Sequence, residues 1–219
     1  MNKVLDPIKF LNKFWPKVRL YDKQVEVVYS VMNNDETYVP AGNMLGKDFI
    51  AGFIAIWFFL SRYPCRVVTT SADHAQLESV LWGEIRRFID TAKYPLVHDK
   101  GGPLVVNHLH IRRMHKGKMC GMSYILGRVA KKGEGLLGHH VSVDSEEFDL
   151  SMSGGVDHSL RVPRTLFIAD EASGVEDIAY ERADTWAARK LIIGNPYQCS
   201  NFFYRAVKNG DILAPDQGE

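Results

Sequence analysis

PAGNMLGKDF, residues 40–49, is the stretch on which the interpretation of this sequence depends. It matches part of the phosphate-binding pattern G-x-x-x-x-G-K-[ST], whose backbone N–H groups surround phosphate oxygens while the lysine contacts them. Two positions depart from the pattern, because Ala41 stands at its first glycine and Asp48 at its Ser or Thr. A Gly-Lys pair between a strand and a helix is also found in ordinary turns, so the loop alone is a weak signal.

The flanking residues predict a strand before this loop and a helix after it. Residues 36–39 form a short β-prone run, and residues 46–61 predict a helix that is apolar on most sides. Gly42 is expected to absorb the sharp turn of the loop, with Ala41 at a negative φ. Lys47 is expected to reach the β- and γ-phosphates. The expected nucleotide-binding residues of the loop are Ala41, Gly42, Asn43, Met44, Leu45, Gly46, Lys47 and Asp48.

Strands and helices alternate along the rest of the chain. Extended segments are predicted at 65–70, 104–113, 121–130, 164–173 and 188–196, and helices at 71–92 and 200–210. Ser71 is the expected cap of the first of these helices. A basic turn between the second and third extended segments predicts a hairpin. The alternation indicates an α/β fold with a mainly parallel sheet, in which ligands bind at the carboxyl ends of the strands.

Composition excludes several other classes of protein. Of the 219 residues 46% are apolar, so a sizeable core is expected. The formal net charge is +1, so the protein is neither strongly basic nor strongly acidic. Three scattered cysteines show no metal-ligand spacing, and a reducing compartment is expected. The N-terminus lacks the apolar core of a signal peptide, and the apolar run 49–60 is too short to span a bilayer.

The predicted strand at 164–173 ends in two acids. The run Leu166–Ala169 is followed directly by Asp170 and Glu171, which is the form of a Walker B strand. Burying two carboxylates is costly, and a Mg²⁺ ion would compensate for that cost. Asp170 would then hold the metal through water, and Glu171 would polarise the attacking water. The alternative is an acidic cap of a following helix.

Two other segments place polar groups near the same edge. Gly194, Asn195 and Pro196 follow a buried strand, where the Asn195 amide would lie near a terminal phosphate; a plain turn is the alternative. Upstream, Gln24 precedes the first strand and can form paired hydrogen bonds with an adenine edge, while Tyr21 can stack on the base. Taken alone, a Gln at this position is more often just a surface helix residue.

Together, in this order, these segments resemble the ATPase domain of the large terminase subunit of tailed phages, the motor that packages DNA into a procapsid. The resemblance implies an adenine-binding Gln motif, a Walker A loop, a Walker B strand with its adjacent Glu, and a coupling motif at Gly194, Asn195 and Pro196. The resemblance spans about residues 15–205 and includes a Gly-rich segment, GEGLLGHH, at 133–140. It implies a three-layer P-loop NTPase of the additional-strand, catalytic-Glu type, with a mainly parallel central sheet and a β-hairpin insertion. The chain would be a single ATPase domain, 1–219. Its parts would be a helical segment with the adenine motif at 1–30, the P-loop core at 31–205, and a linker or tail toward an absent nuclease domain at 206–219.

The resemblance also implies function and partners. ATP hydrolysis with Mg²⁺ would drive translocation of double-stranded viral DNA, without nuclease activity from this chain. The partners would be double-stranded DNA, the portal protein of the procapsid, the small terminase subunit and further copies of the chain in a ring, with no membrane. The location would be the cytoplasm of the infected host cell.

Asp48 and the missing loop arginine set this sequence apart from the family. Asp48 would give the metal a carboxylate, a stronger oxygen ligand than a hydroxyl, which predicts a working loop with stronger metal dependence. Terminase loops often include an arginine, whereas this one has Asn43-Met44-Leu45, so the transition-state arginine must come from elsewhere. Arg128, at the end of an apolar strand, is the candidate finger, in cis or in trans. A surface salt bridge is the alternative for Arg128, and its rivals for finger or DNA contact are Arg112, Arg113 and Lys131.

Two other functions remain open. A DEAD-like helicase shares this form of Walker B strand but needs a second domain carrying arginines. A nucleotide-sensing scaffold with an inactive site is the non-enzymatic alternative, against which intact Lys47 and Glu171 argue.

Overall fold

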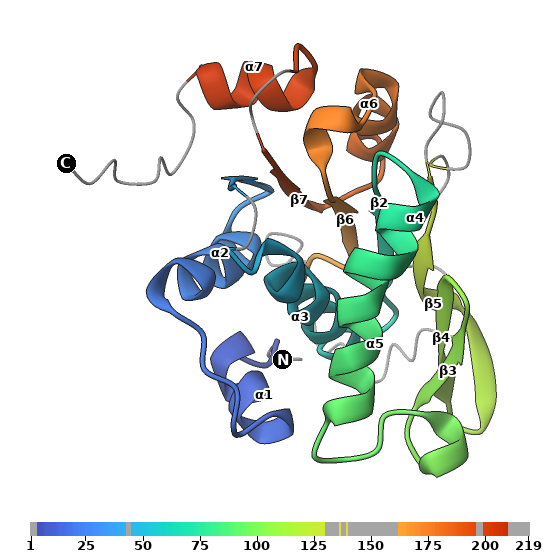
Figure 1. The fold of residues 1–219 in the computed structure, drawn as a ribbon. Helices are drawn as coiled ribbons and strands as arrows, with labels where there is room; N and C mark the ends of the chain where they lie inside the picture. Colours follow the sequence, from blue (N-terminus) through green and yellow to red (C-terminus); the bar gives the residue numbers. More distant parts are fainter. Residues whose placement is uncertain are drawn as a thin grey trace.

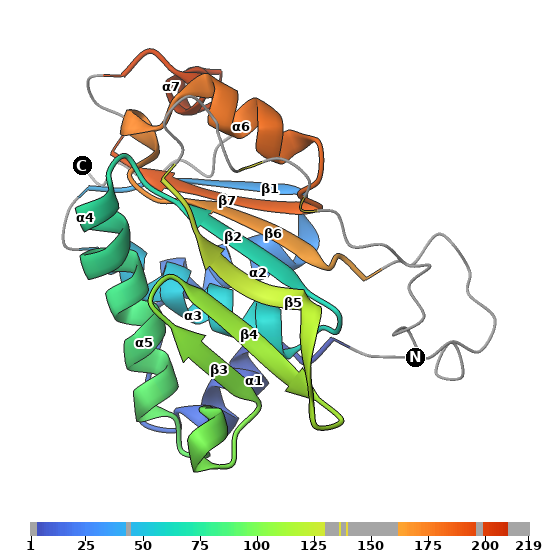
Figure 2. The same cartoon turned by 90° about the vertical axis from the view of Figure 1, so that its right-hand side faces the viewer.

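A seven-stranded sheet forms the centre of the protein (Figures 1 and 2). The computed structural model describes residues 4–42, 45–129, 136, 139, 162–195 and 199–209. The strand order across the sheet is β1-β7-β6-β2-β5-β4-β3. The strands are β1 (Glu36–Pro40), β2 (Arg66–Thr70), β3 (Leu104–Asn107), β4 (His110–His115), β5 (Lys118–Gly127), β6 (Thr165–Ala169) and β7 (Arg189–Gly194).

The parallel part of the sheet has the predicted additional-strand arrangement. Neighbouring strands from β1 through β7, β6 and β2 to β5 are parallel, whereas β4 and β3 continue the sheet in antiparallel fashion. β7 lies between β1, which precedes the Gly-Lys loop, and β6, which precedes the acidic pair. This confirms the predicted α/β fold class. The antiparallel strands are continuous with the sheet through β5.

Helices cover both faces of the sheet and make three layers (Figure 2). One face packs against α1 (Pro7–Phe14), α2 (Asp22–Asn33), α3 (Lys47–Leu60) and α5 (Trp82–Thr91); the other packs against α6 (Asp177–Asp184) and α7 (Phe202–Lys208). Strand residues alternate between the faces, as the pleat requires. On β6, Leu166 and Ile168 join the α3 side of the core, and Phe167 and Ala169 join the α6 side.

α3 is the most deeply buried helix of the described chain. Its residues from Ile50 to Phe59 are buried on every side, which explains why the segment lacks an amphipathic pattern. α3 also approaches α5 closely, because a Cβ on Gly52 would lie 2.9 Å from Cβ of Glu84. None of the described helices combines the length and apolar character that crossing a membrane requires.

The helix predicted at 71–92 begins differently from our expectation. Its cap is Asp73, whose side chain accepts a hydrogen bond from the backbone N–H of Gln76 at 2.8 Å, so the prediction of Ser71 was wrong. Ser71 is buried at the end of β2 instead. The helix consists of α4 (His74–Gln76), a π-helical turn (Leu77–Leu81) and α5. After the π turn, the indole N–H of Trp82 donates to Oγ1 of Thr69 at 2.9 Å.

The extended segment predicted at 104–113 is two strands. The chain reverses between β3 and β4 at His108 and Leu109. The turn contains no Gly or Pro, and the alternation of apolar and polar side chains continues through it, so the sequence reads as one strand. The basic turn predicted after it is present, with Lys116 and Gly117 at positive φ between β4 and β5.

Candidate active site

The Gly-Lys loop leaves β1 beside β7 and enters α3 through a left-handed residue. The N–H of Ala41 donates to the carbonyl of Gly194 at 3.0 Å, which fixes the start of the loop. Gly46 has φ +67 and is the N-cap of α3. Among the described loop residues Gly46, and not Gly42, has a left-handed backbone, and the expected role of Gly42 in the turn remains a prediction. Asn43 and Met44 lie outside the described residues.

Tyr21 and Gln24 contact the loop from the side of α2. The hydroxyl of Tyr21 donates to the carbonyl of Leu45 at 2.5 Å, and Nε2 of Gln24 donates to the carbonyl of Gly46 at 3.4 Å. A Cβ on Gly46 would lie 2.8 Å from Nε2 of Gln24. These contacts position the second half of the loop. The predicted adenine contacts of both side chains remain predictions.

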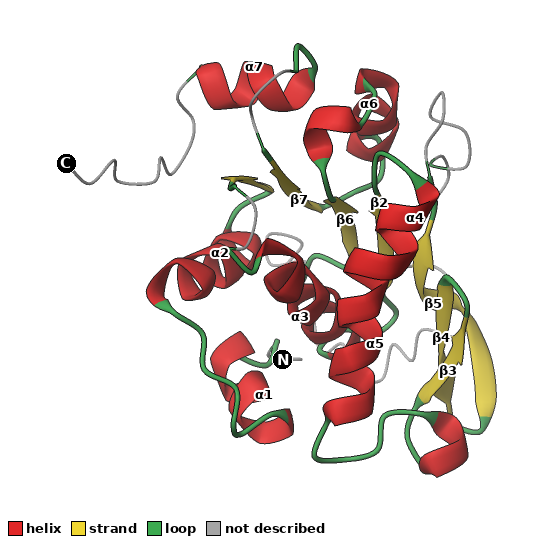
Figure 3. Cartoon of the chain, in the orientation of Figure 1, coloured by secondary structure: helices red, strands yellow, loops and turns green. Residues whose placement is uncertain are grey.

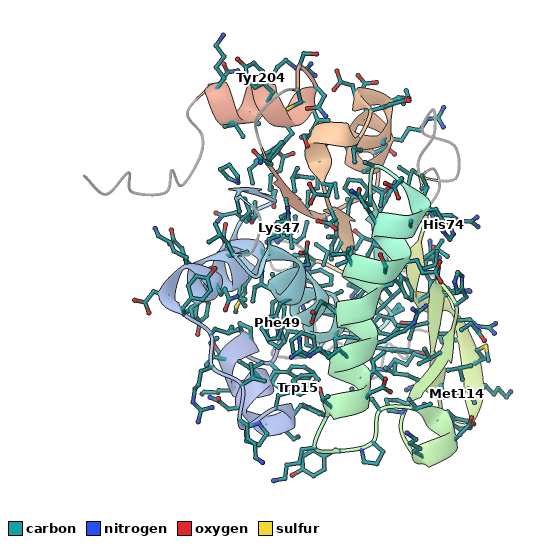
Figure 4. All side chains as sticks on the ribbon, in the orientation of Figure 1. Trp15, Lys47, Phe49, His74, Met114 and Tyr204 are labelled. Carbon is teal, nitrogen blue, oxygen red and sulfur yellow. The ribbon has the colours of Figure 1, made fainter. Side chains whose placement is uncertain are left out.

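Lys47 and Glu171 form an ion pair at the centre of the site. Nζ of Lys47 lies 2.6 Å from Oε1 of Glu171, and the lysine side chain is 4% exposed. Figure 4 shows Lys47 at the start of α3, beside the strands. Glu171 has φ +47, a conformation that costs energy in a residue other than glycine. Such backbone outliers cluster at functional sites.

Asp170 is fully buried at the end of β6. Burial, and then the negative charges of Asp48 and Glu171, raise its pKa to about 7. Oδ1 of Asp170 accepts the backbone N–H of Glu171 at 2.9 Å. Among the described residues, neither Oδ2 of Asp170 nor the buried Oδ1 of Asp48 has a hydrogen-bond partner. Two carboxylate oxygens are thus left for a ligand.

These carboxylates do not form a complete metal site. In the described part of the chain, no group of three or more His, Cys, Asp or Glu residues is placed to hold a metal ion. Mg²⁺ is usually bound by one or two carboxylates, several waters and substrate phosphates, so a site of this kind suits it better than a protein cage would. The metal roles of Asp48 and Asp170 remain predictions.

The end of β7 contacts both neighbouring loops. The carbonyl of Gly194 accepts the N–H of Ala41, and a Cβ on Gly194 would lie 2.8 Å from the N–H nitrogen of Ala172. Glycine is therefore needed where β7 passes the turn after Glu171. Asn195 follows, half-buried, and Pro196 lies outside the described residues.

Two polar residues of this region were not predicted as site residues. Asn201 begins α7, and its Nδ2 donates to the carbonyls of Ala172 and Val175, both at 2.7 Å. Ser71 lies at the end of β2 with a buried hydroxyl. Its position directly after a predicted strand was a usable signal, since parallel strands end at one edge.

Arg128 lies away from Lys47. Its backbone N–H donates to the carbonyl of Thr69 and extends the β2–β5 ladder by one residue, which places Arg128 opposite Thr70. By the pleat, both side chains leave the sheet on the α6 side. Burial, and then the charges of Arg112 and Arg128, lower the pKa of His110 on β4. Arg128 is exposed, and its role as a finger remains a prediction.

The rivals of Arg128 differ in their surroundings. Arg113 is directed into the protein, where its NH1 donates to the carbonyl of Arg62 at 3.0 Å, so it is part of the packing. Arg112 is half-buried on β4, and Lys131 lies outside the described residues. Most of the Gly-rich segment 133–140 also lies outside them. Within that segment, Leu136 is buried and its carbonyl accepts the indole N–H of Trp186.

Comparisons with known proteins extend this description. No protein-family model and no curated protein matches the chain. Two solved structures of the ATPase domain of the Thermus phage P74-26 large terminase, one of them a mutant, match with TM-scores of 0.60 and 0.61. Both are 15% identical to this chain and cover 90% of it and 72% of their own chains. The large terminase of the thermophilic bacteriophage D6E, solved in complex with ADP, matches with a TM-score of 0.47 and 14% identity, covering 80% of this chain and 38% of that chain. The protein therefore has the fold of phage large-terminase ATPase domains.

Proposed function

We propose that this protein binds and hydrolyses ATP, and that hydrolysis drives double-stranded viral DNA into a procapsid. The observation that carries the proposal is the meeting of Lys47, Asp170 and Glu171 at the carboxyl ends of β1 and β6, with β7 between those strands. Open parallel sheets bind ligands at this edge.

The start of α3 is suited to phosphate. The first turn of a helix presents N–H groups without intrahelical partners, and the helix dipole favours negative charge there. Lys47 adds a positive charge at the same point. If the triphosphate of ATP lies along the loop, its β- and γ-phosphates would reach the amine of Lys47.

Asp170 and Asp48 are suited to a hydrated divalent cation. Their unpartnered oxygens are acceptors that water molecules of a Mg²⁺ ion would satisfy. A bound cation would also favour the ionised form of Asp170, whose pKa is otherwise raised to about 7. Mg²⁺ would supply neutralisation of the charge on the terminal phosphates.

Glu171 is suited to orient and deprotonate the attacking water. Its side chain is part-exposed, so water has access, and its carboxylate is held beside Lys47. Phosphate oxygens that bind Lys47 would compete with Glu171 for the amine. When phosphate displaces Glu171 from the amine of Lys47, the carboxylate would become available to bind the attacking water, and this would happen only with substrate bound.

The packaging role is supported by the fold that the chain shares with the Thermus phage domain. As partners we propose double-stranded DNA, the portal protein, the small terminase subunit and further copies of the chain in a ring, acting in the cytoplasm of the infected host cell. Arg128 leaves the sheet on the face away from Lys47, which favours action on a neighbour's nucleotide over action on its own.

ATP turnover of the purified chain tests this proposal. We expect Mg²⁺-dependent hydrolysis that Lys47→Ala abolishes, with Lys9→Ala, a change outside the site, as the control. Packaging would be assayed with procapsids and linear duplex DNA. Strand separation without packaging would favour a helicase, and ATP binding without hydrolysis under all these conditions would favour a nucleotide-sensing scaffold.

A further inference from the structure

Ser71 lies opposite Asp170 in the sheet. The N–H of Asp170 donates to the carbonyl of Thr70 at 2.9 Å, which continues the parallel β2–β6 ladder one residue past the pair Thr70 and Ala169. In a parallel ladder this bond sets Asp170 directly across from Ser71, about 4.8 Å away between strands.

Both side chains leave the sheet on the same face. Thr69, two residues before Ser71, points to the α5 side, where its Oγ1 accepts the indole N–H of Trp82. Ile168, two residues before Asp170, belongs to the same side of the core. The charge of Asp48, in the first turn of α3, also acts on Asp170. Ser71 and Asp170 thus leave neighbouring strand ends on the face that α3 covers, and Asp48 of α3 is near enough for its charge to act on Asp170.

Each of these residues keeps one oxygen without a partner. Oγ of Ser71, Oδ2 of Asp170 and Oδ1 of Asp48 are buried and unbonded among the described residues. Ser71 is 3% exposed and Asp170 is 0% exposed. A buried polar group without a partner is costly, and two on neighbouring strand ends, with the charge of Asp48 acting on one of them, indicate a ligand that bonds these oxygens.

We propose that Ser71 is a third oxygen of the cation site, and that its hydroxyl positions a water molecule of the divalent ion held by Asp170 and Asp48. The usual loop supplies one neutral hydroxyl, from the residue after its lysine. Here that position is Asp48, and the hydroxyl comes from the neighbouring strand. The inference rests on the proposed ATP site and assigns it a residue outside its motifs.

Mn²⁺ binding to the full chain tests this role. Mn²⁺ would be titrated and the free ion measured by electron paramagnetic resonance, with and without a non-hydrolysable ATP analogue. We expect Ser71→Ala to weaken Mn²⁺ binding in the presence of the analogue by tenfold or more, since loss of a residue that orients metal ligands typically costs about 10–100-fold. Ser71→Thr keeps the hydroxyl and should restore most of the affinity.

Thr70→Val is the matched control. Thr70 is also fully buried with an unpartnered hydroxyl, but it lies on the opposite face of the sheet, and valine has nearly its shape. Thr70→Val should leave Mn²⁺ affinity unchanged. Binding of the analogue in EDTA should be the same in wild type and Ser71→Ala, because only the cation site is altered.

The outcomes separate this inference from the proposed function. If wild type binds Mn²⁺ with the analogue and Ser71→Ala binds it equally well, the role of Ser71 is wrong and the ATP site stands. If Ser71→Ala and Thr70→Val weaken Mn²⁺ binding equally, the effect is one of packing and the role is also wrong. If wild type binds neither the analogue nor Mn²⁺, both proposals fail.

Discussion

Nζ of Lys47 lies 2.6 Å from Oε1 of Glu171, so the cation expected at the phosphates and the carboxylate expected at the water satisfy each other. In the proposed function each would change partner when ATP binds. The pair would then affect both the affinity for nucleotide and the availability of the base.

Glu171→Gln should separate these two effects. Removing the competing charge should raise ATP affinity by about tenfold, because hydrogen bonds to charged groups contribute about 1.5–3 kcal/mol. Turnover should fall by roughly 10²–10⁴-fold with loss of the base. Fluorescent-nucleotide binding and phosphate release measure the two quantities, with the exposed Glu176→Gln as the control. Unchanged turnover would show that Glu171 is not the base.

Asp170 should make the metal-free protein less stable as pH rises. Its pKa is raised from 3.8 to about 7, so the folded state holds a proton that the unfolded state has lost between these values. The contribution of Asp170 to the free energy of unfolding is then largest below about pH 4 and declines up to about pH 7, by on the order of 4 kcal/mol. Urea unfolding in EDTA across this range checks the slope. Asp170→Asn, which has no proton to lose, should lack this contribution; identical slopes for the two proteins would contradict the assignment.

Asp48 should tune the requirement for Mg²⁺. Asp48→Thr removes a negative charge beside the phosphates, so metal-free ATP should bind better, and the advantage should shrink at saturating Mg²⁺. Asp48→Ala removes the ligand and should raise the Mg²⁺ needed for half-maximal turnover. ATP affinity and turnover across a Mg²⁺ titration measure both effects. Coincident curves for the three proteins would mean that Asp48 does not act on the metal.

Gly46→Ala should disturb the loop, whereas Gly42→Ala should not. At φ +67 an alanine costs about 1–2 kcal/mol, and its Cβ would also press on Gln24. Gly42 is outside the left-handed region and has open space around its Cα. We expect lower thermal stability and weaker ATP binding for the first variant alone. Equal behaviour of the two variants would contradict the loop geometry.

Arg128→Ala should bind ATP normally and lose turnover by orders of magnitude if Arg128 completes a neighbour's site. Mixing it with Glu171→Ala protein should recover part of the activity, since some interfaces then pair an intact arginine with an intact glutamate. Lys118→Ala, at the opposite end of β5, is the control. A confirmed oligomer without recovery would place the arginine in cis or in a structural role.

The fold could be predicted from the sequence because its signals are local. Buried strands such as 165–169 and 189–194 contain short apolar runs, Leu166–Ala169 and Leu191–Ile193, and α3 is too apolar to lie anywhere but in the core. The reversal at His108 and Leu109 could not be predicted in this way, because no Gly or Pro marks it.

The site could be predicted only as far as its motifs extend. Lys47, Asp170 and Glu171 occupy positions that their motifs define. The neighbours of Ser71 and Asn201 are remote in sequence: Asp170 lies opposite Ser71 across the sheet, and Asn201 donates to the carbonyl of Ala172, so these relationships become visible only in the structure. Glu171, which pairs with Lys47, has a left-handed backbone that no sequence pattern predicted.

Because of the π turn at Leu77–Leu81, the number of residues between Asp73 and Trp82 matters as much as which residues they are. The N–H of Trp82 bonds to the carbonyl of Leu77, five residues back, so the turn contains one residue more than an α-helical turn. Deleting Val80, which is exposed, would convert the segment to continuous α-helix and rotate everything before it relative to α5 by about 100°. The chain would then lose either the Asp73 cap or the bond from Trp82 to Thr69. A comparison of homologous sequences by residue identity alone would miss this constraint on the number of residues. A one-residue gap at this segment in an alignment would reveal it.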